Sequence, residues 1–116
     1  MKIVIISDTH LNEVKLPPGD VLVHCGDGLS GGTLQELVKL NAWLGKVKHQ
    51  YRYVLYSPGN HDKIFEHDLL LARSIMTNAT VLVDQAFDID GFRFYCSPWT
   101  PEFCFWSYQI LSLIHI

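Results

Sequence analysis

Three short apolar segments, each followed at once by a polar cluster, constrain the fold of this chain more than any other feature. Residues 3–6 read Ile-Val-Ile-Ile, residues 21–25 read Val-Leu-Val-His-Cys, and residues 53–56 read Tyr-Val-Leu-Tyr. Apolar runs without polar alternation are typical of strands that are buried on both faces, as in parallel sheets. We therefore predict three buried parallel strands.

Helices are predicted between and after these strands. Thr33 and Glu36 form the capping-box pattern Thr-Leu-Gln-Glu, which marks a helix start. Trp43 borders the apolar stripe of this helix, and we expect it in the core. The stripe follows helical spacing, with one further apolar residue beside it: Leu37, Leu40, Leu44, Val47 and Val38. A second helix is expected over roughly 63–75. Strand, helix, strand and helix in succession predict parallel crossovers and an α/β fold.

The pattern changes after residue 79, where Val81-Leu82-Val83 begins a further strand. Asp90-Gly91 then separates two segments with alternating aromatic and aliphatic residues, Phe87 and Ile89 before it and Phe92 and Phe94 after it. An Asp-Gly pair in this context is typical of a hairpin with a two-residue turn. We expect the later strands to be antiparallel, so that the fold contains mixed sheets.

The polar clusters at the three strand ends are the candidate functional site, because the carboxyl ends of parallel strands gather at one edge of a sheet. Asp8 and His10 lie two residues apart, so both can bind one metal ion. Asp27 can bridge two ions, and Asn60 offers an amide oxygen to the second. His61 is expected to face a substrate. The clusters are Asp8-Thr9-His10, Gly26-Asp27 and Gly59-Asn60-His61-Asp62.

This ligand set predicts two-metal hydrolysis. Two ions about 3.5–4 Å apart can activate a water by lowering its pKa from about 15.7 to roughly 7, and can clamp phosphate oxygens. Carboxylate, imidazole and amide ligands suit Mn, Fe, Zn or Ni, so we expect two divalent ions of one of these kinds. The alternative interpretation is that Asp8, Asp27 and Asn60 only cap turns.

The three clusters resemble the first signature blocks of the calcineurin-like metallophosphoesterases. Residues 91–101 are similar to the corresponding segment of the metallophosphoesterase-domain proteins of vertebrate brain and their bacterial relatives, and the resemblance covers residues 1 to about 110. It implies the N-terminal part of an α-β-β-α sandwich with mixed sheets. It also implies a metal-dependent hydrolase of phosphate mono- or diesters. The implied metal ligands are Asp8, His10, Asp27 and Asn60, with His61 acting at the phosphate or leaving group.

Two departures from the family pattern matter. The lone histidine and the Gly-His-x-His block that complete the family's metal shells do not occur, so we expect a partial domain with little activity. Protein Ser/Thr phosphatases carry Gly-Asp-x-x-Asp-Arg-Gly, whereas residues 26–32 read Gly-Asp-Gly-Leu-Ser-Gly-Gly. This difference argues against a protein phosphatase and favours small, nucleotide-like phosphoesters as substrates.

The end of the chain has an unusual sequence. Residues 111–116, Leu-Ser-Leu-Ile-His-Ile, match one translated frame of the transposon end used in common sequencing libraries. We therefore expect a partial metallophosphoesterase domain over residues 1–110 and a non-native, adapter-derived tail over residues 111–116. On this interpretation His115 is not a metal ligand.

Charge and composition exclude other classes of function. The net charge is −3, so nucleic acid is not the expected partner. No apolar stretch is long enough for a signal peptide or a membrane span. Three cysteines without a secretory signal are typical of reduced thiols, and we predict a cytoplasmic protein.

Three alternative functions are compatible with parts of this sequence. A non-catalytic scaffold could keep this fold, but a scaffold has no need for His61 beside the ligand set. Residues 26–33 resemble a P-loop, yet Gly32 stands where the phosphate-binding lysine is required. A nuclease of the same superfamily fits poorly with the acidic balance.

Four further polar or aromatic residues have predicted roles. His24 lies within a strand and is expected to be a hydrogen-bonded core residue. Asp62 either orients His61 through a hydrogen bond or caps the helix that follows it. Trp99 and Trp106 are expected to pack in the core, with stacking on a substrate as the alternative.

Overall fold

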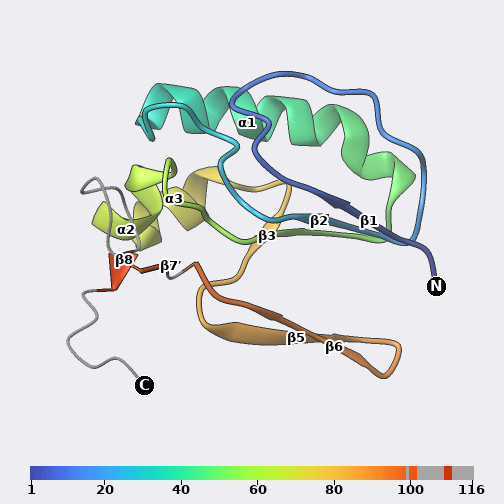
Figure 1. Cartoon of the computed structure of the whole chain (residues 1–116). Helices are drawn as coiled ribbons and strands as arrows, with labels where there is room; N and C mark the ends of the chain where they lie inside the picture. The colour runs from blue at the N-terminus through green and yellow to red at the C-terminus, as the bar shows by residue number, and fades with distance from the viewer. Residues whose placement is uncertain (99, 102–108, 111–116) are drawn as a thin grey trace.

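The computed structural model describes residues 1–98, 100, 101, 109 and 110 (Figure 1). Its centre is a sheet in which every neighbouring pair of strands is parallel. The strands lie in the order β1 (Ile3–Ile6), β2 (Val21–His24), β3 (Tyr53–Tyr56) and β4 (Thr80–Val81). The prediction of three parallel strands is confirmed.

Helices connect β2 to β3 and β3 to β4, as the parallel crossovers require. The first connection is α1 (Leu34–Val47) with the short 3-10 helix η1 (Lys48–Gln50), and the second is α2 (Lys63–His67) with α3 (Leu69–Ile75). Thr33 and Glu36 make both hydrogen bonds of the predicted capping box. The single helix predicted over 63–75 is wrong, because Asp68 leaves the helical conformation and its side chain accepts a hydrogen bond from Leu71 at the start of α3.

An antiparallel hairpin follows the parallel sheet. It consists of β5 (Gln85–Ile89) and β6 (Phe92–Cys96), and the pairing of Ile89 with Phe92 leaves Asp90-Gly91 as the predicted two-residue turn. A final parallel pair consists of β7 (Thr100–Pro101) and β8 (Gln109–Ile110). The expectation that the later strands are antiparallel holds only for β5 and β6. It is wrong for β7 and β8, which are parallel, and for β4, because α3 returns the chain to the sheet edge in the direction of β3.

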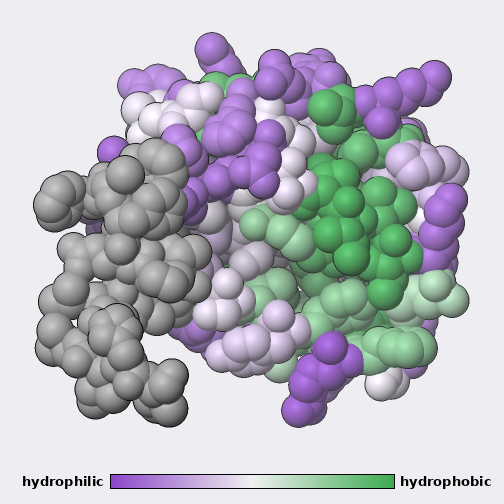
Figure 2. All heavy atoms as spheres, in the orientation of Figure 1, coloured by the Kyte–Doolittle hydropathy of each residue, from purple (hydrophilic) through white to green (hydrophobic). Residues whose placement is uncertain are grey.

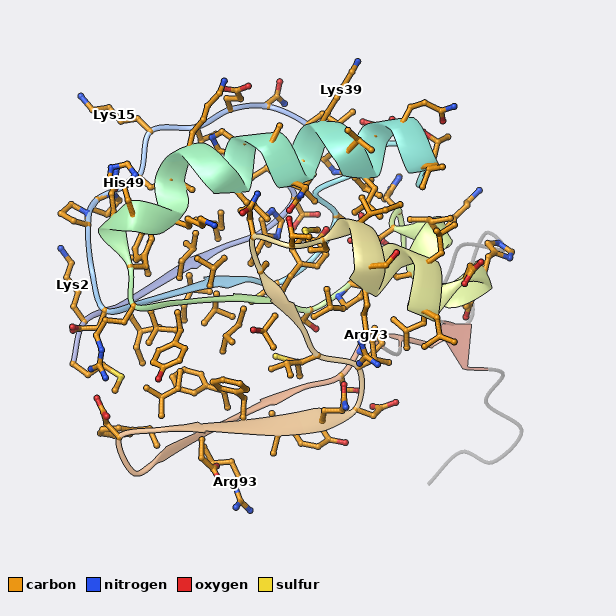
Figure 3. All side chains as sticks on the ribbon, turned by 180° about the vertical axis from the view of Figure 1, so that it is seen from behind. Lys2, Lys15, Lys39, His49, Arg73 and Arg93 are labelled. Atoms are coloured by element: carbon orange, nitrogen blue, oxygen red, sulfur yellow. The ribbon has the colours of Figure 1, made fainter. Side chains whose placement is uncertain are left out.

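The described residues form three layers, with α1 on one face of the parallel sheet and the hairpin on the other (Figure 1). Side chains fill the space between the sheet and the hairpin in the view from behind (Figure 3). One core cluster lies on the helical side and includes Trp43, as predicted. The second lies under the hairpin and consists of Val21, Val23, Leu55, Leu82, Ile89 and Cys96. The architecture agrees with the N-terminal part of the predicted two-sheet sandwich.

Two apolar residues are more exposed than predicted. Val38 on α1 is 54% exposed, so it does not belong to the buried stripe. On β1, Ile5 is 67% exposed, because β1 is the edge strand and the hairpin covers β2 and β3 instead. Figure 2 shows this apolar surface over β1, between α1 and the hairpin. Burial on both faces is therefore wrong for β1.

Some predictions concern residues outside the described part of the chain. They are the packing of Trp99 and Trp106, the state of Cys104, and the tail over residues 111–116. Among the described residues, no helix has both the length and the apolar character needed to cross a membrane.

Candidate metal centre

The candidate site lies at the carboxyl edge of the parallel sheet, on the side where α1 begins (Figure 1). The loop after β1 and the loop after β2 are joined along their backbones at this edge. The amides of Asp8, His10 and Leu11 donate to the carbonyls of Gly26, Asp27 and Gly28 over 2.9, 2.9 and 2.7 Å. These bonds bring the first two predicted clusters together although they are far apart in sequence.

The backbone of this edge is strained at the predicted ligands. Asp8, His10 and Asp27 adopt φ angles of 57°, 46° and 57°, which non-glycine residues rarely adopt. Such conformations cost on the order of 1–3 kcal/mol each, and they persist where the surrounding structure holds them. Residues held in this way cluster at functional sites in proteins. The strain therefore agrees with a functional role for the three residues.

Asp8, His10 and Asp27 form a group that can hold a cation. Each offers one ligand atom, and the three atoms lie within 4.8 Å of one another. Burial raises the pKa of Asp27, and the neighbouring Asp8 carboxylate raises it further, whereas hydrogen bonding from Ser7 lowers the pKa of Asp8. Two carboxylates this close repel each other, and a divalent cation between them would remove that cost. The donor set thus fits a metal ion.

The ring of His10 is oriented as metal-binding histidines usually are. Its Nδ1 lies 3.1 Å from the Leu29 carbonyl, so Nδ1 carries the proton and donates. Its Nε2 lies 3.9 Å from an Asp8 carboxylate oxygen, on the side of the ligand group. A backbone acceptor at one ring nitrogen fixes the tautomer and leaves the other nitrogen for a metal.

The loop after β3 contacts Asp27 through the two neighbours of Asn60. The His61 amide donates to Asp27 Oδ1 over 2.8 Å, and a Cβ on Gly59 would lie 2.3 Å from the same oxygen. The His61 ring stands edge-on to the His10 ring with centroids 4.9 Å apart, and its Nδ1 lies 3.0 Å from the Ser30 carbonyl. The third cluster thus adjoins the other two, while the ligand role of Asn60 and the catalytic role of His61 stay predictions.

Asp62 does not cap the following helix, which was one of its two predicted roles. Its side chain makes no capping hydrogen bond to α2. The carboxylate is fully buried and accepts hydrogen bonds from four other donors, none of which is the His61 side chain. Burial raises the pKa of Asp62 to about 6. One donor is the hydroxyl of Tyr56. The only indication of this role in the sequence is a tyrosine at the end of an apolar strand.

His24 is a buried, hydrogen-bonded core residue, as predicted. The Gly26 amide donates to its Nδ1 over 3.1 Å, so Nε2 carries the proton and donates to Thr9 Oγ1 over 2.9 Å. Burial lowers the pKa of His24 to about 4, with Asp8 opposing this shift, and the Tyr56 ring packs 4.7 Å away. His24 therefore supports the loops on either side of the ligands and is not a ligand itself.

We expect His24→Asn to change how stability depends on pH. The unfolded chain protonates His24 below about pH 6.5 and the folded chain only below about 4, so burial of the neutral ring loses stability as the pH falls. Between pH 7 and 5 this loss is about 2 kcal/mol. Asparagine keeps an acceptor for Gly26 and does not titrate. Urea unfolding of both proteins should show their stability difference shrinking by that amount, and a constant difference would contradict the prediction.

Comparisons with known proteins agree with this geometry. The profile of the family described as calcineurin-like phosphoesterase matches residues 1–107. The chain is 31% identical over 134 aligned residues to human metallophosphoesterase domain-containing protein 1, covering 94% of this chain and 40% of that protein. It is 37% identical to a UPF0046 protein of Caenorhabditis elegans, covering 87% of this chain and 40% of that protein. The chain thus spans about 40% of the length of these curated relatives.

Proposed function

The chain belongs to the calcineurin-like phosphoesterase family. On that premise, we propose that the complete protein hydrolyses small phosphate mono- or diesters with two divalent metal ions. The observation that carries the proposal is the group formed by Asp8, His10 and Asp27, whose ligand atoms lie within 4.8 Å. When bound, the ions would supply an activated water and neutralise charge on the phosphate. Mn, Fe, Zn and Ni all suit this ligand set.

Each residue of the site has a proposed task. Asp8 and His10 would hold one ion, and Asp27 would be a ligand shared with the second. Asn60 would hold the second ion through its amide oxygen, a role supported by the contacts that the residues on either side of it make with Asp27. His61 donates a proton to the leaving oxygen. Because its Nδ1 contacts the Ser30 carbonyl, its Nε2 points away from the loop that contains Ser30.

The proposed substrates are small phosphoesters, including nucleotide-like ones. Residues 26–32 lack the second Asp and the Arg of the protein phosphatase pattern. The net charge of −3 gives no general attraction for nucleic acid. We also propose the cytoplasm as the compartment, in agreement with the free thiols of Cys25 and Cys96.

His61→Ala is expected to lower kcat for bis-p-nitrophenyl phosphate with Mn²⁺ by about 10²–10⁴-fold, because the leaving oxygen loses its proton donor. Mn²⁺ affinity should change little, since alanine keeps the backbone amide that contacts Asp27. The assay uses the complete product of the natural gene, whatever its length. His49→Ala, in η1, is the matched control and should keep full activity. Equal kcat in the parent and in His61→Ala would refute the assigned role.

A further inference from the structure

The buried carboxylate of Asp62 connects two of the three loops that make up the metal centre. Its Oδ2 accepts from the amides of Asp27 and Gly59, both over 2.9 Å, and its Oδ1 accepts from the amide of Leu29 over 3.0 Å. Asp27 and Leu29 belong to the loop after β2, and Gly59 belongs to the loop after β3. A single side chain thus satisfies backbone donors from both loops.

The fourth donor, Tyr56, fixes the position of this carboxylate. The Tyr56 hydroxyl donates to Asp62 Oδ2 over 2.6 Å and accepts from the Gly28 amide over 3.0 Å. Tyr56 is the last residue of β3 and is fully buried, with its ring stacked 5.3 Å from that of Phe65. Because the ring is held by the core, its hydroxyl is a fixed point for both the carboxylate and the loop after β2.

Asp27 is held by hydrogen bonds at both its backbone and its side chain. It is held in a left-handed conformation with φ of 57°, which needs support from surrounding groups. Its amide is bound by Asp62, while its own Oδ1 accepts from the amide of His61, the residue next to Asp62. The two hydrogen bonds run in opposite directions between the same pair of loops. They set both the backbone and the carboxylate of Asp27.

We propose that Tyr56 and Asp62 are positioning residues, which hold Asp27 against the loop of residues 59–61 in the geometry that metal binding requires. The proposal rests on the proposed function, because it assigns Asp27 as a ligand. Neither residue belongs to the group of ligand atoms formed by Asp8, His10 and Asp27. They act on metal binding through the Asp27 backbone. A buried donor that loses its acceptor cannot form a hydrogen bond with water instead, so the loss is costly.

The test uses Asp62→Asn and Tyr56→Phe in two measurements. In Asp62→Asn, the NH₂ group must face at least one of the four donors, because Oδ1 accepts from one of them and Oδ2 from three. In Tyr56→Phe, the Gly28 amide loses its acceptor. We expect Mn²⁺ affinity, measured by calorimetry, to fall by about 10–100-fold in either variant. In the metal-free proteins, we expect the Asp27, Leu29 and Gly59 amides to exchange hydrogen at least about tenfold faster, measured by NMR.

Asp68→Asn is the matched control. Asp68 also accepts a backbone hydrogen bond, from Leu71 at the start of α3, but within the described part of the chain it is not a hydrogen-bond partner of the metal loops. It should leave both Mn²⁺ affinity and the exchange of the Asp27 and Gly59 amides unchanged. A general loss of stability would instead raise exchange in α1 as well as in the loops.

The outcomes separate this inference from the proposed function. If the parent protein binds no Mn²⁺, the proposed function fails, and hydrogen exchange alone decides whether Tyr56 and Asp62 hold Asp27. If Asp62→Asn does not fold, Tyr56→Phe decides the same question. Folded variants with parental amide exchange, or with parental Mn²⁺ affinity in a protein that binds Mn²⁺, would overturn the inference.

Discussion

Asp27→Asn is expected to remove most of the Mn²⁺ affinity of this protein. Substitution of a residue that only supports a metal ligand lowers metal affinity by about 10–100-fold. Because Asp27 is itself the proposed shared ligand, we expect Mn²⁺ affinity to fall by more than about 100-fold. The metal-free variant should be at least as stable as the parent, because the change removes a half-buried charge beside Asp8. Asparagine can still accept the hydrogen bond from the His61 amide.

The measurement is thermal or urea unfolding with and without Mn²⁺. A ligand at 100 times its dissociation constant stabilises the parent by about 2.7 kcal/mol, and Asp27→Asn should lose this increment. Asp88→Asn is the control, because Asp88 pairs with Arg93 on the hairpin and lies outside the ligand group. An unchanged Mn²⁺ increment in Asp27→Asn would contradict the role of Asp27 as a ligand.

Gly26→Ala is expected to destabilise the fold by roughly 3 kcal/mol or more, through backbone strain and overpacking together. Gly26 has a φ of 103°, and a Cβ there would lie 2.6 Å from the Gly59 amide nitrogen and 2.8 Å from the Ser57 carbonyl oxygen. These are backbone atoms, so the loops after β2 and β3 would have to separate. The Mn²⁺-dependent increment should fall as well, because that separation moves Asp27 relative to Asn60.

Gly91→Ala separates the two causes. Gly91 also has a positive φ, of 83°, but a Cβ there would meet nothing within 4 Å. It should therefore show only the conformational cost of about 1–2 kcal/mol and keep the full Mn²⁺ increment. The difference between the two variants in urea unfolding measures the close approach of the loops at Gly26. Equal effects of the two substitutions would show that the loops are not packed as described.

The α/β class of this chain could be predicted because its signals are local. Apolar runs, the Thr33–Glu36 capping box and the Asp90-Gly91 turn each act within a few residues, and the structure confirms all three. The gathering of Asp8, His10 and Asp27 could also be predicted, since parallel strands bring their carboxyl ends to one edge. A short apolar run cannot show whether its strand lies at an edge, which is why the exposure of Ile5 was missed.

The residues that could bind a metal, and the loops on which they lie, could be predicted from the amino-acid sequence alone. How those loops are held together, through the Asp62 carboxylate and the left-handed backbone of the predicted ligands, became apparent only in the folded chain. These contacts join residues that are far apart in the sequence. Asp62 meets Asp27 across 35 residues and Leu29 across 33, and no periodicity, cap or turn pattern extends so far. A buried carboxylate accepts hydrogen bonds from whichever donors the packing of the chain brings next to it, and that packing depends on the whole fold.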